Sequence, residues 1–305
     1  MQSVSLPMMT TSEPLTAPIL PQATQPQTLC FGIPLKARSV AQNWDWTVRD
    51  FNRTLASIYN QSNPNFQILV GCHEIPELLI PTDHRLEFIQ ASSPAPDLSN
   101  DPRSIYSDKL QKFTYLGERF RQRGGGWFMV LDADDLISSR LVEFVLRNPH
   151  PNGFIARQGY ILDQQAGLMA IIPNPNIFGH HFDQITGSCA VIRFGQEDFG
   201  TTEQDYRQSR FGRYVAFANH VELWDMSVQT GRPLSPFPFP ACVYVVNTGE
   251  NYSFIHGSSR KWRNEELIPA LRRKPLPIDE KLLNEFALHH PVWQGSGLNR
   301  FQSKN

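Results

Sequence analysis

The most constraining feature of this sequence is a short apolar run that leads directly into three carboxylates. Trp127 to Leu131 (WFMVL) has no charged side chain, which predicts a strand buried on both faces. The next four residues are Asp132, Ala133, Asp134 and Asp135. Carboxylates this close together repel one another at neutral pH unless a cation or basic side chains lie nearby. We therefore expect a charged site at the end of a buried strand.

Strand and helix patterns alternate through the first half of the chain. Apolar runs predict buried strands, and apolar residues at steps of three or four predict amphipathic helices. In order, the expected elements are a strand over 28–34, a helix over 45–59, strands over 66–70 and 86–89, a helix over 108–123, the strand over 127–131 and a helix over 138–146. This order predicts an α/β fold with a mostly parallel central sheet flanked by helices.

The rest of the chain is less regular. Its clearest elements are a helix over 221–230 and a strand over 241–246. Residues 1–27 are rich in Pro, Thr, Gln and Ser and contain no Lys or Arg, which predicts a disordered leader and not a secretory signal. We expect one large domain over 28–260, followed by a C-terminal extension over 261–305.

Composition narrows the classes of partner. The net charge of -1 gives no global attraction for nucleic acid, so we expect none. No segment approaches the roughly 20 apolar residues that cross a bilayer. Cys30, Cys72, Cys189 and Cys242 form no CxxC pair, which predicts reduced, buried thiols and a cytoplasmic protein. The basic stretch Arg260–Arg263 either contacts an anionic membrane surface peripherally or is simply solvated.

The position of the acidic cluster favours a ligand site. Ligands of open α/β sheets bind beyond the carboxyl ends of the strands, and Asp132 directly follows one. Carboxylate oxygens on a loop suit Mg²⁺ or Mn²⁺ shared with a diphosphate. The alternative is an Asp-rich start for the next helix, since carboxylates stabilise helix N-termini by about 0.3–1 kcal/mol each.

A family resemblance supports the ligand site. Residues 126–136 (GWFMVLDADDL) resemble the strand and DxDD signature of glycosyltransferase family 2 and related GT-A enzymes. Weaker matches are a first strand that ends at Pro34, TLASIYNQ over 54–61 and GSCAVIR over 187–193. The resemblance covers about residues 28–256. It implies a GT-A fold and a Mn²⁺- or Mg²⁺-dependent glycosyltransferase. Such an enzyme moves a sugar, with inversion, from a nucleotide-sugar donor to a hydroxyl of a saccharide or lipid-linked acceptor.

The resemblance also implies roles for single residues. Pro34 and Asp132 would hold the donor, Asp132 through the nucleoside or ribose. Asp135 would hold either the cluster or the sugar. Asp134 would bind the metal that bridges the donor diphosphate. His256, which follows the last expected strand, would complete the metal sphere, or else it is a structural histidine.

Two segments depart from the family pattern. Many members have an acidic Asp-Asp-Gly-Ser loop where this chain has Gly71–Glu74, so Glu74 would contact the nucleotide base or is a solvated residue. Members carry Glu-Asp, with Asp as the general base, where this chain has Asn219-His220. His220 is one candidate base, because histidine accepts protons near neutral pH, and Glu222 is the other. If neither serves, the chain is a non-catalytic nucleotide-sugar-binding module.

Several basic side chains remain as candidates. Lys109 and Lys112 share one helix face and would reach the donor phosphates, or they are solvated. The candidates on the acceptor side are Arg157, His180 and His181. The nearest rival enzyme is a sugar nucleotidyltransferase. Such enzymes usually have a Gly-rich loop after the first strand, whereas this chain has a single glycine there.

Overall fold

Two β-sheets organise the molecule. The computed structural model describes residues 28–99, 104–175, 179–200, 203–216, 219–251, 261 and 263–298. In spatial order, the larger sheet consists of β10 (Ser235–Pro236), β6 (Gly153–Ile155), β9 (Ala190–Phe194), β4 (Gly126–Val130), β1 (Leu29–Pro34), β2 (Phe66–Cys72) and β3 (Leu86–Gln90). The smaller sheet consists of β5 (Leu136–Ile137), β11 (Cys242–Val246), β7 (Gly159–Asp163) and β8 (Leu168–Ile172).

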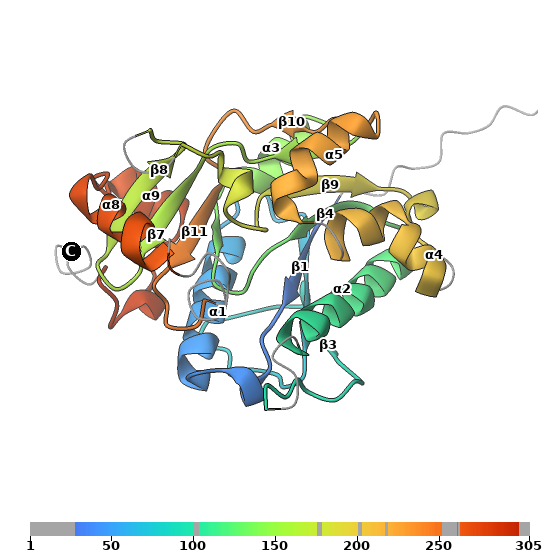
Figure 1. Cartoon of the computed structure of the whole chain (residues 1–305), viewed down its shortest axis with the longest axis horizontal. Helices are drawn as coiled ribbons and strands as arrows, with labels where there is room; N and C mark the ends of the chain where they lie inside the picture. The colour runs from blue at the N-terminus through green and yellow to red at the C-terminus, as the bar shows by residue number, and fades with distance from the viewer. Residues whose placement is uncertain are drawn as a thin grey trace, which may run out of the picture.

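Helices and short helical turns surround both sheets (Figure 1). The helices are α1 (Trp44–Tyr59), α2 (Ser104–Gln122), α3 (Leu141–Arg147), α4 (Glu203–Gln208), α5 (Leu223–Gln229), α8 (Ile268–Arg273) and α9 (Glu280–Glu285). The turns are η1 (Arg38–Val40), η2 (Phe182–Gln184), η3 (Gln196–Asp198), η4 (Gly212–Ala216), η5 (His220–Glu222), η6 (Arg263–Leu267) and η7 (Pro291–Trp293). The fold is therefore mixed α/β, as the sequence predicts.

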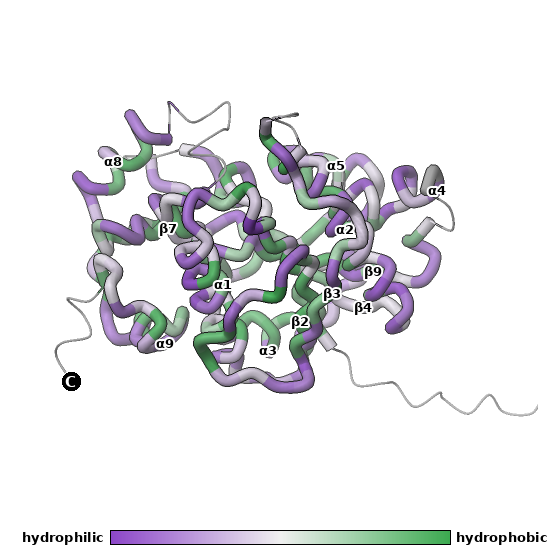
Figure 2. Tube along the Cα trace, turned by 90° about the horizontal axis from the view of Figure 1, so that it is seen from below, coloured by the Kyte–Doolittle hydropathy of each residue, from purple (hydrophilic) through white to green (hydrophobic). Residues whose placement is uncertain are grey.

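The strands of the first half pair in parallel, which confirms the predicted central sheet. β1 pairs in parallel with both β2 and β4, and β2 pairs in parallel with β3. β4 runs through the core, where Trp127, Phe128 and Met129 are at most 2% exposed. In Figure 2 the hydrophobic positions follow the interior strands, and hydrophilic positions dominate the outer turns. Because β1 and β4 are parallel neighbours, the segments that follow them emerge at the same edge.

Local signals explain where α1 begins and where α2 ends. The Asn43 side chain accepts hydrogen bonds from the N–H groups of Asp45 and Trp46, which fixes the start of α1. α2 begins at Ser104, four residues before the predicted start, and ends at Gln122. Gly124 follows with φ of 98°, a left-handed conformation that terminates helices at little cost only in glycine.

The second half adds antiparallel pairing that the sequence does not predict. β9 is antiparallel to β4 and β6, and β7 is antiparallel to β8. The smaller sheet shares a second core with part of the expected C-terminal extension, where Phe286 and Trp293 are fully buried. Figure 1 shows α8 and α9 beside this sheet. The described residues of the C-terminal extension therefore pack against the smaller sheet.

Three further predictions concern the chain as a whole. All four cysteines are free and buried, as predicted. In the part of the chain that the structure describes, no helix has both the length and the apolar content needed to span a bilayer. The predicted leader over 1–27 lies outside the described residues.

Candidate functional site

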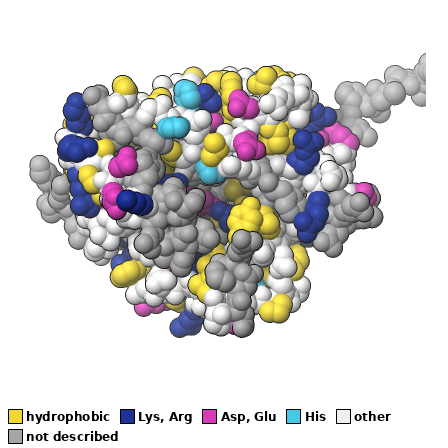
Figure 3. All heavy atoms as spheres, in the orientation of Figure 1, with side chains coloured by type: hydrophobic (Ala, Val, Ile, Leu, Met, Phe, Trp, Pro, Cys, Tyr) yellow, Lys and Arg dark blue, Asp and Glu magenta, His cyan; other side chains and the backbone are white. Residues whose placement is uncertain are grey.

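A cavity of about 650 Å³ lies where β1 and β4 end. Its walls include Pro34 and Lys36, which end and follow β1, and Asp132 and Asp134, which follow β4. Figure 3 shows a hollow near the middle of the face drawn in Figure 1. The cavity therefore has the position typical of ligand sites in open α/β sheets, beyond the carboxyl ends of parallel strands.

Asp132 is held at the cavity by three contacts. Its backbone N–H donates to Ser188 Oγ at 2.9 Å. Its Oδ1 accepts from Lys109 Nζ at 2.6 Å, so the predicted donor residue and the predicted phosphate-binding lysine form an ion pair. Its backbone oxygen accepts from the N–H of Asp135 at 3.1 Å, which closes a tight turn in the acidic loop.

Asp135 turns away from the cavity and is fully buried. Its Oδ2 accepts from Thr186 Oγ1 at 2.8 Å, and its Oδ1 accepts from the backbone N–H of Val245 at 3.1 Å. Burial and the neighbouring Asp132 raise the pKa of this carboxyl above its usual range. Asp135 therefore ties the acidic loop to β11 of the smaller sheet and holds the cluster in place.

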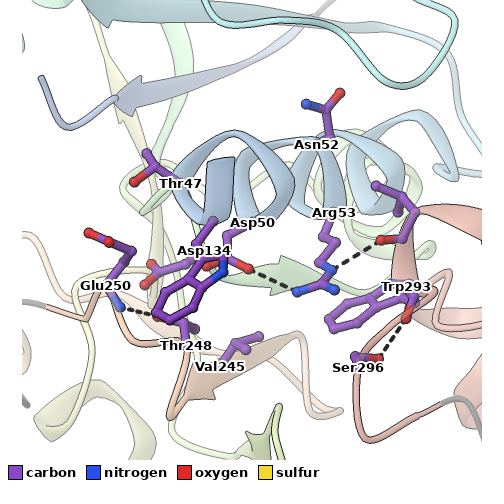
Figure 4. Close-up of polar contacts among 12 residues, drawn as sticks. Thr47, Asp50, Asn52, Arg53, Asp134, Val245, Thr248, Glu250, Trp293 and Ser296 are labelled. Atoms are coloured by element: carbon purple, nitrogen blue, oxygen red, sulfur yellow. Dashed lines mark hydrogen bonds and ion pairs between the residues drawn. The ribbon is translucent and has the colours of Figure 1, made fainter. Parts of the chain in front are cut away.

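Asp134 points to a different group of residues. Its Oδ2 accepts from Asn251 Nδ2 at 2.8 Å, and the side-chain oxygen of Asn251 is fixed by Thr248. The buried Asp50 of α1 lies beside it, as Figure 4 shows. Burial, followed by the charges of Asp135, Asp132 and Asp50, raises the pKa of Asp134 well above its usual range. The carboxyl group is thus in a position that favours either a proton or a bound cation.

His220 reaches the same cavity from η5. The Asn219 side chain accepts from the N–H of Val221 and so caps the start of η5. Burial lowers the pKa of His220 to about 4, while Asp132 raises it and Lys109 lowers it by smaller amounts. The imidazole is therefore neutral at physiological pH and has a free nitrogen for a proton, while the same burial disfavours the protonated ring.

The remaining predicted donor residues differ in position. Pro34 lines the cavity. Lys112 also lines it, but its Nζ is buried and donates to Asp108 Oδ2 at 2.5 Å and to the Leu35 oxygen at 2.8 Å. Glu74 is not among the lining residues, and its Oε2 accepts from the N–H of Arg38 at 3.1 Å. Glu74 therefore holds the loop after β1.

The second candidate base and the acceptor-side candidates lie away from the cavity wall. Glu222 is exposed and does not line the cavity. Arg157 pairs with Asp183 at 3.2 Å and stacks over Trp224. His180 and His181 are likewise not among the lining residues. His256 lies outside the described residues.

The oxygen ligands at Asp134 are compatible with a hard divalent cation. Within the described ranges, no three His, Cys, Asp or Glu side chains converge so as to hold a metal ion by themselves. Mg²⁺ and similar ions that bind nucleotides need only one or two carboxylates, because phosphate oxygens and water complete the coordination. The carboxylate of Asp134 fits a site of this shared kind.

Several polar residues of the cavity wall were not identified from the sequence. Lys36 Nζ donates to Glu250 Oε2 at 2.7 Å, and Glu250 also accepts from the N–H groups of Gln42 and Asn43. These bonds fix the segment between β1 and α1 against the segment that follows β11. The charged and amide residues among them include Lys36, Asp50, Asp108, Glu250 and Asn251. The available signal was Asp50, a carboxylate on the apolar face of a predicted amphipathic helix.

Comparisons with known proteins give little further guidance. No protein-family model matches the chain, and no curated protein matches its sequence. Among solved structures, S. aureus TarS (residues 1–349) is similar with a TM-score of 0.35 and 11% sequence identity. The match covers 72% of this chain and 60% of that chain. A structural similarity this weak does not identify the function of the chain.

Proposed function

We propose that the chain is a glycosyltransferase of GT-A type that transfers a sugar from a nucleotide-sugar donor to a hydroxyl acceptor. The observation that carries this proposal is the meeting of Asp132, Asp134 and a neutral His220 in one cavity at the carboxyl ends of β1 and β4. Carboxylates at a strand end suit a metal-bound diphosphate, and a neutral imidazole suits an acceptor hydroxyl.

The donor would lie along the polar wall of the cavity. Asp132 would accept a hydrogen bond from the nucleoside, and Lys109, its ion-pair partner, would turn toward the phosphates. Pro34 at the end of β1 would border the base or ribose. Asp134 would hold Mn²⁺ or Mg²⁺. Such an ion, when bound, stabilises negative charge on a departing nucleoside diphosphate.

His220 would act as the general base. Its unprotonated ring would take the proton of the acceptor hydroxyl, and a direct displacement of this kind inverts the anomeric centre. Holding the hydroxyl and the donor in one cavity supplies positioning, which is a large part of catalysis in transfers of this type. His220 is preferred to Glu222 because Glu222 is exposed and lies off the cavity wall.

The acceptor would have an apolar part beside its reacting hydroxyl. Apolar side chains from α2, η4 and α5 line part of the cavity, and they are Ile105, Leu110, Phe113, Tyr214, Val215 and Leu223. A lipid-linked saccharide combines a hydroxyl with an apolar body and would use this wall. A peripheral contact with a membrane surface in the cytoplasm would then bring the acceptor to the enzyme.

Thermal unfolding against a panel of nucleoside diphosphates and nucleotide sugars, with and without Mn²⁺, tests the donor site. A ligand at 100 times its dissociation constant adds about 2.7 kcal/mol of stability, which raises the midpoint measurably. We expect a Mn²⁺-dependent shift with one nucleotide, lost in Asp132→Ala and kept in Asp225→Ala, an exposed carboxylate of α5. No shift with any nucleotide, in folded protein, would refute the proposal.

Release of nucleoside diphosphate from the matching nucleotide sugar then separates an enzyme from a binding module. Glycosyltransferases commonly leak sugar to water, so we expect slow release that Asp134→Ala abolishes without loss of the fold. Binding without any release would favour the non-catalytic alternative.

A further inference from the structure

An unpartnered carboxylate oxygen lies against the acidic loop. Asp50, in the middle of α1, is 4% exposed and lines the cavity. Its Oδ1 accepts from Arg53 Nη1 at 2.9 Å, whereas its Oδ2 is buried and makes no hydrogen bond of normal geometry among the described residues. The Gln164 side chain is a neighbour of this carboxyl group and lowers its pKa by less than burial raises it. Figure 4 shows the Asp50 and Asp134 side chains next to each other beneath α1. A buried carboxylate oxygen without a partner is rare in native proteins, because no hydrogen bond offsets the free-energy cost of removing it from water.

The nearby cations compensate for this pair only in part, since the charges of Arg53 and, more weakly, Arg49 act on Asp50. Arg53 binds the other oxygen of Asp50, donates to the Val292 backbone oxygen at 3.3 Å and stacks on Trp293. Lys36, the lysine whose charge acts on Asp134, is paired with Glu250 at 2.7 Å. The second oxygen of Asp50 and the carboxylate of Asp134 therefore form a negative centre at the cavity wall whenever Asp134 is ionised.

We propose that Asp50 and Asp134 together bind one divalent cation, Mg²⁺ or Mn²⁺, which makes Asp50 of α1 a metal ligand outside the DxDD loop. This inference rests on the proposed function only in that donor phosphate and water complete the coordination. Asp132 is paired with Lys109 and is proposed to contact the nucleoside, and Asp135 is bonded to Thr186 away from the cavity, so neither is needed as a ligand. Two carboxylates plus phosphate oxygens are a common ligand set for Mg²⁺.

Direct Mn²⁺ binding, measured by electron paramagnetic resonance without nucleotide, tests the proposal. Loss of an outer partner of a metal ligand typically costs about 10–100-fold in affinity, so Asp50→Asn and Asp134→Asn should each cost at least about tenfold. Asp132→Asn should change the affinity by less than about threefold, because Asp132 is not a ligand here. Asp45→Asn is the matched control, since Asp45 is exposed on the same helix.

A measurement on the unmodified chain covers the case in which Asp50→Asn does not fold. Mn²⁺ broadens the amide signals of residues near it, so titration of the ¹⁵N-labelled protein should broaden Asp50 and Asp134 first. A folded Asp50→Cys variant should lose Mn²⁺ and gain Cd²⁺, because thiolate prefers soft metals. Broadening centred elsewhere, or Mn²⁺ affinity independent of Asp50, would overturn the proposal and leave the pair to share a proton.

The two proposals fail in different ways. Mn²⁺ binding that depends on Asp50, without any nucleotide-induced shift, would keep the cation site and remove the transferase. Nucleotide binding that depends on Asp132, with Mn²⁺ binding indifferent to Asp50, would keep the transferase and remove this cation site.

Discussion

Protonation of His220 is the property that most directly tests the proposed catalysis. Burial lowers the pKa of this imidazole from 6.5 to about 4. One pKa unit corresponds to about 1.4 kcal/mol, so the fold disfavours the charged ring by about 3 kcal/mol. At pH 5.5 only about 3% of the rings would carry a proton, against about 90% for a ring with the ordinary pKa.

The sign of the effect on stability follows from the lowered pKa. Between pH 6.5 and about 4 the unfolded chain binds a proton at His220 that the folded chain does not bind. His220 therefore destabilises the fold as the pH falls through this window and has no such effect above it. His220→Gln should lose less stability than the wild type on acidification from pH 7 to 4.5.

NMR titration of histidine ring signals measures this pKa without any assumption about substrate. The His220 signal is the one missing in His220→Gln, and exposed His84 provides a reference signal. Because Lys109 lowers the pKa and Asp132 raises it, Lys109→Met should move the midpoint up and Asp132→Asn should move it down. A His220 midpoint near 6.5, unchanged by either variant, would refute the buried neutral base.

Three further predictions concern packing and are measured by urea unfolding. Asp135→Ala should cost at least about 2 kcal/mol, because it leaves two buried donors without their acceptor. Trp293→Ala should cost about 3–5 kcal/mol, because this fully buried ring fills the second core. Gly117→Ala should cost about 1–3 kcal/mol, because its Cβ would lie 2.4 Å from a ring carbon of Phe211. An unchanged midpoint in any variant would contradict the contact from which its cost is derived.

The sequence predicted the elements whose signals are local. β1 to β4, α1 and α2 were each expected from an apolar run or a helical period, and their bounds differ from the prediction by a few residues. The smaller sheet was largely missed: of its four strands only β11 was expected. β5 has two residues, and β7 and β8 become a sheet only through pairing with each other and with β11. Such pairing depends on tertiary contacts between distant residues, which a short stretch of sequence does not reveal.

Some residues of the candidate site were likewise predicted from local signals, and others were not. Asp132, Asp134 and His220 line one cavity, although the rule about strand ends predicts only the first two. Glu222 was the second candidate base in the sequence, after His220, and the turn at η5 leaves it exposed. Asp50 was not predicted, because a carboxylate within a helix carries no local sign that a second carboxylate will face it.

The charges of the cavity predict that the cation and the donor strengthen each other's binding. Every lysine in its wall already has a carboxylate partner, as the pairs Lys36–Glu250, Lys109–Asp132 and Lys112–Asp108 show. Asp50 is paired with Arg53 through one oxygen only, Asp134 accepts from the Asn251 amide, and the wall also holds Arg263. When Asp134 is ionised, a diphosphate that approached this part of the wall alone would therefore meet negative charge on Asp134 and on the second oxygen of Asp50. A divalent cation reverses that sign, and the donor phosphates in turn supply ligands that the protein lacks. Because binding energies are coupled reciprocally, Mn²⁺ should tighten the nucleotide by the same factor by which the nucleotide tightens Mn²⁺.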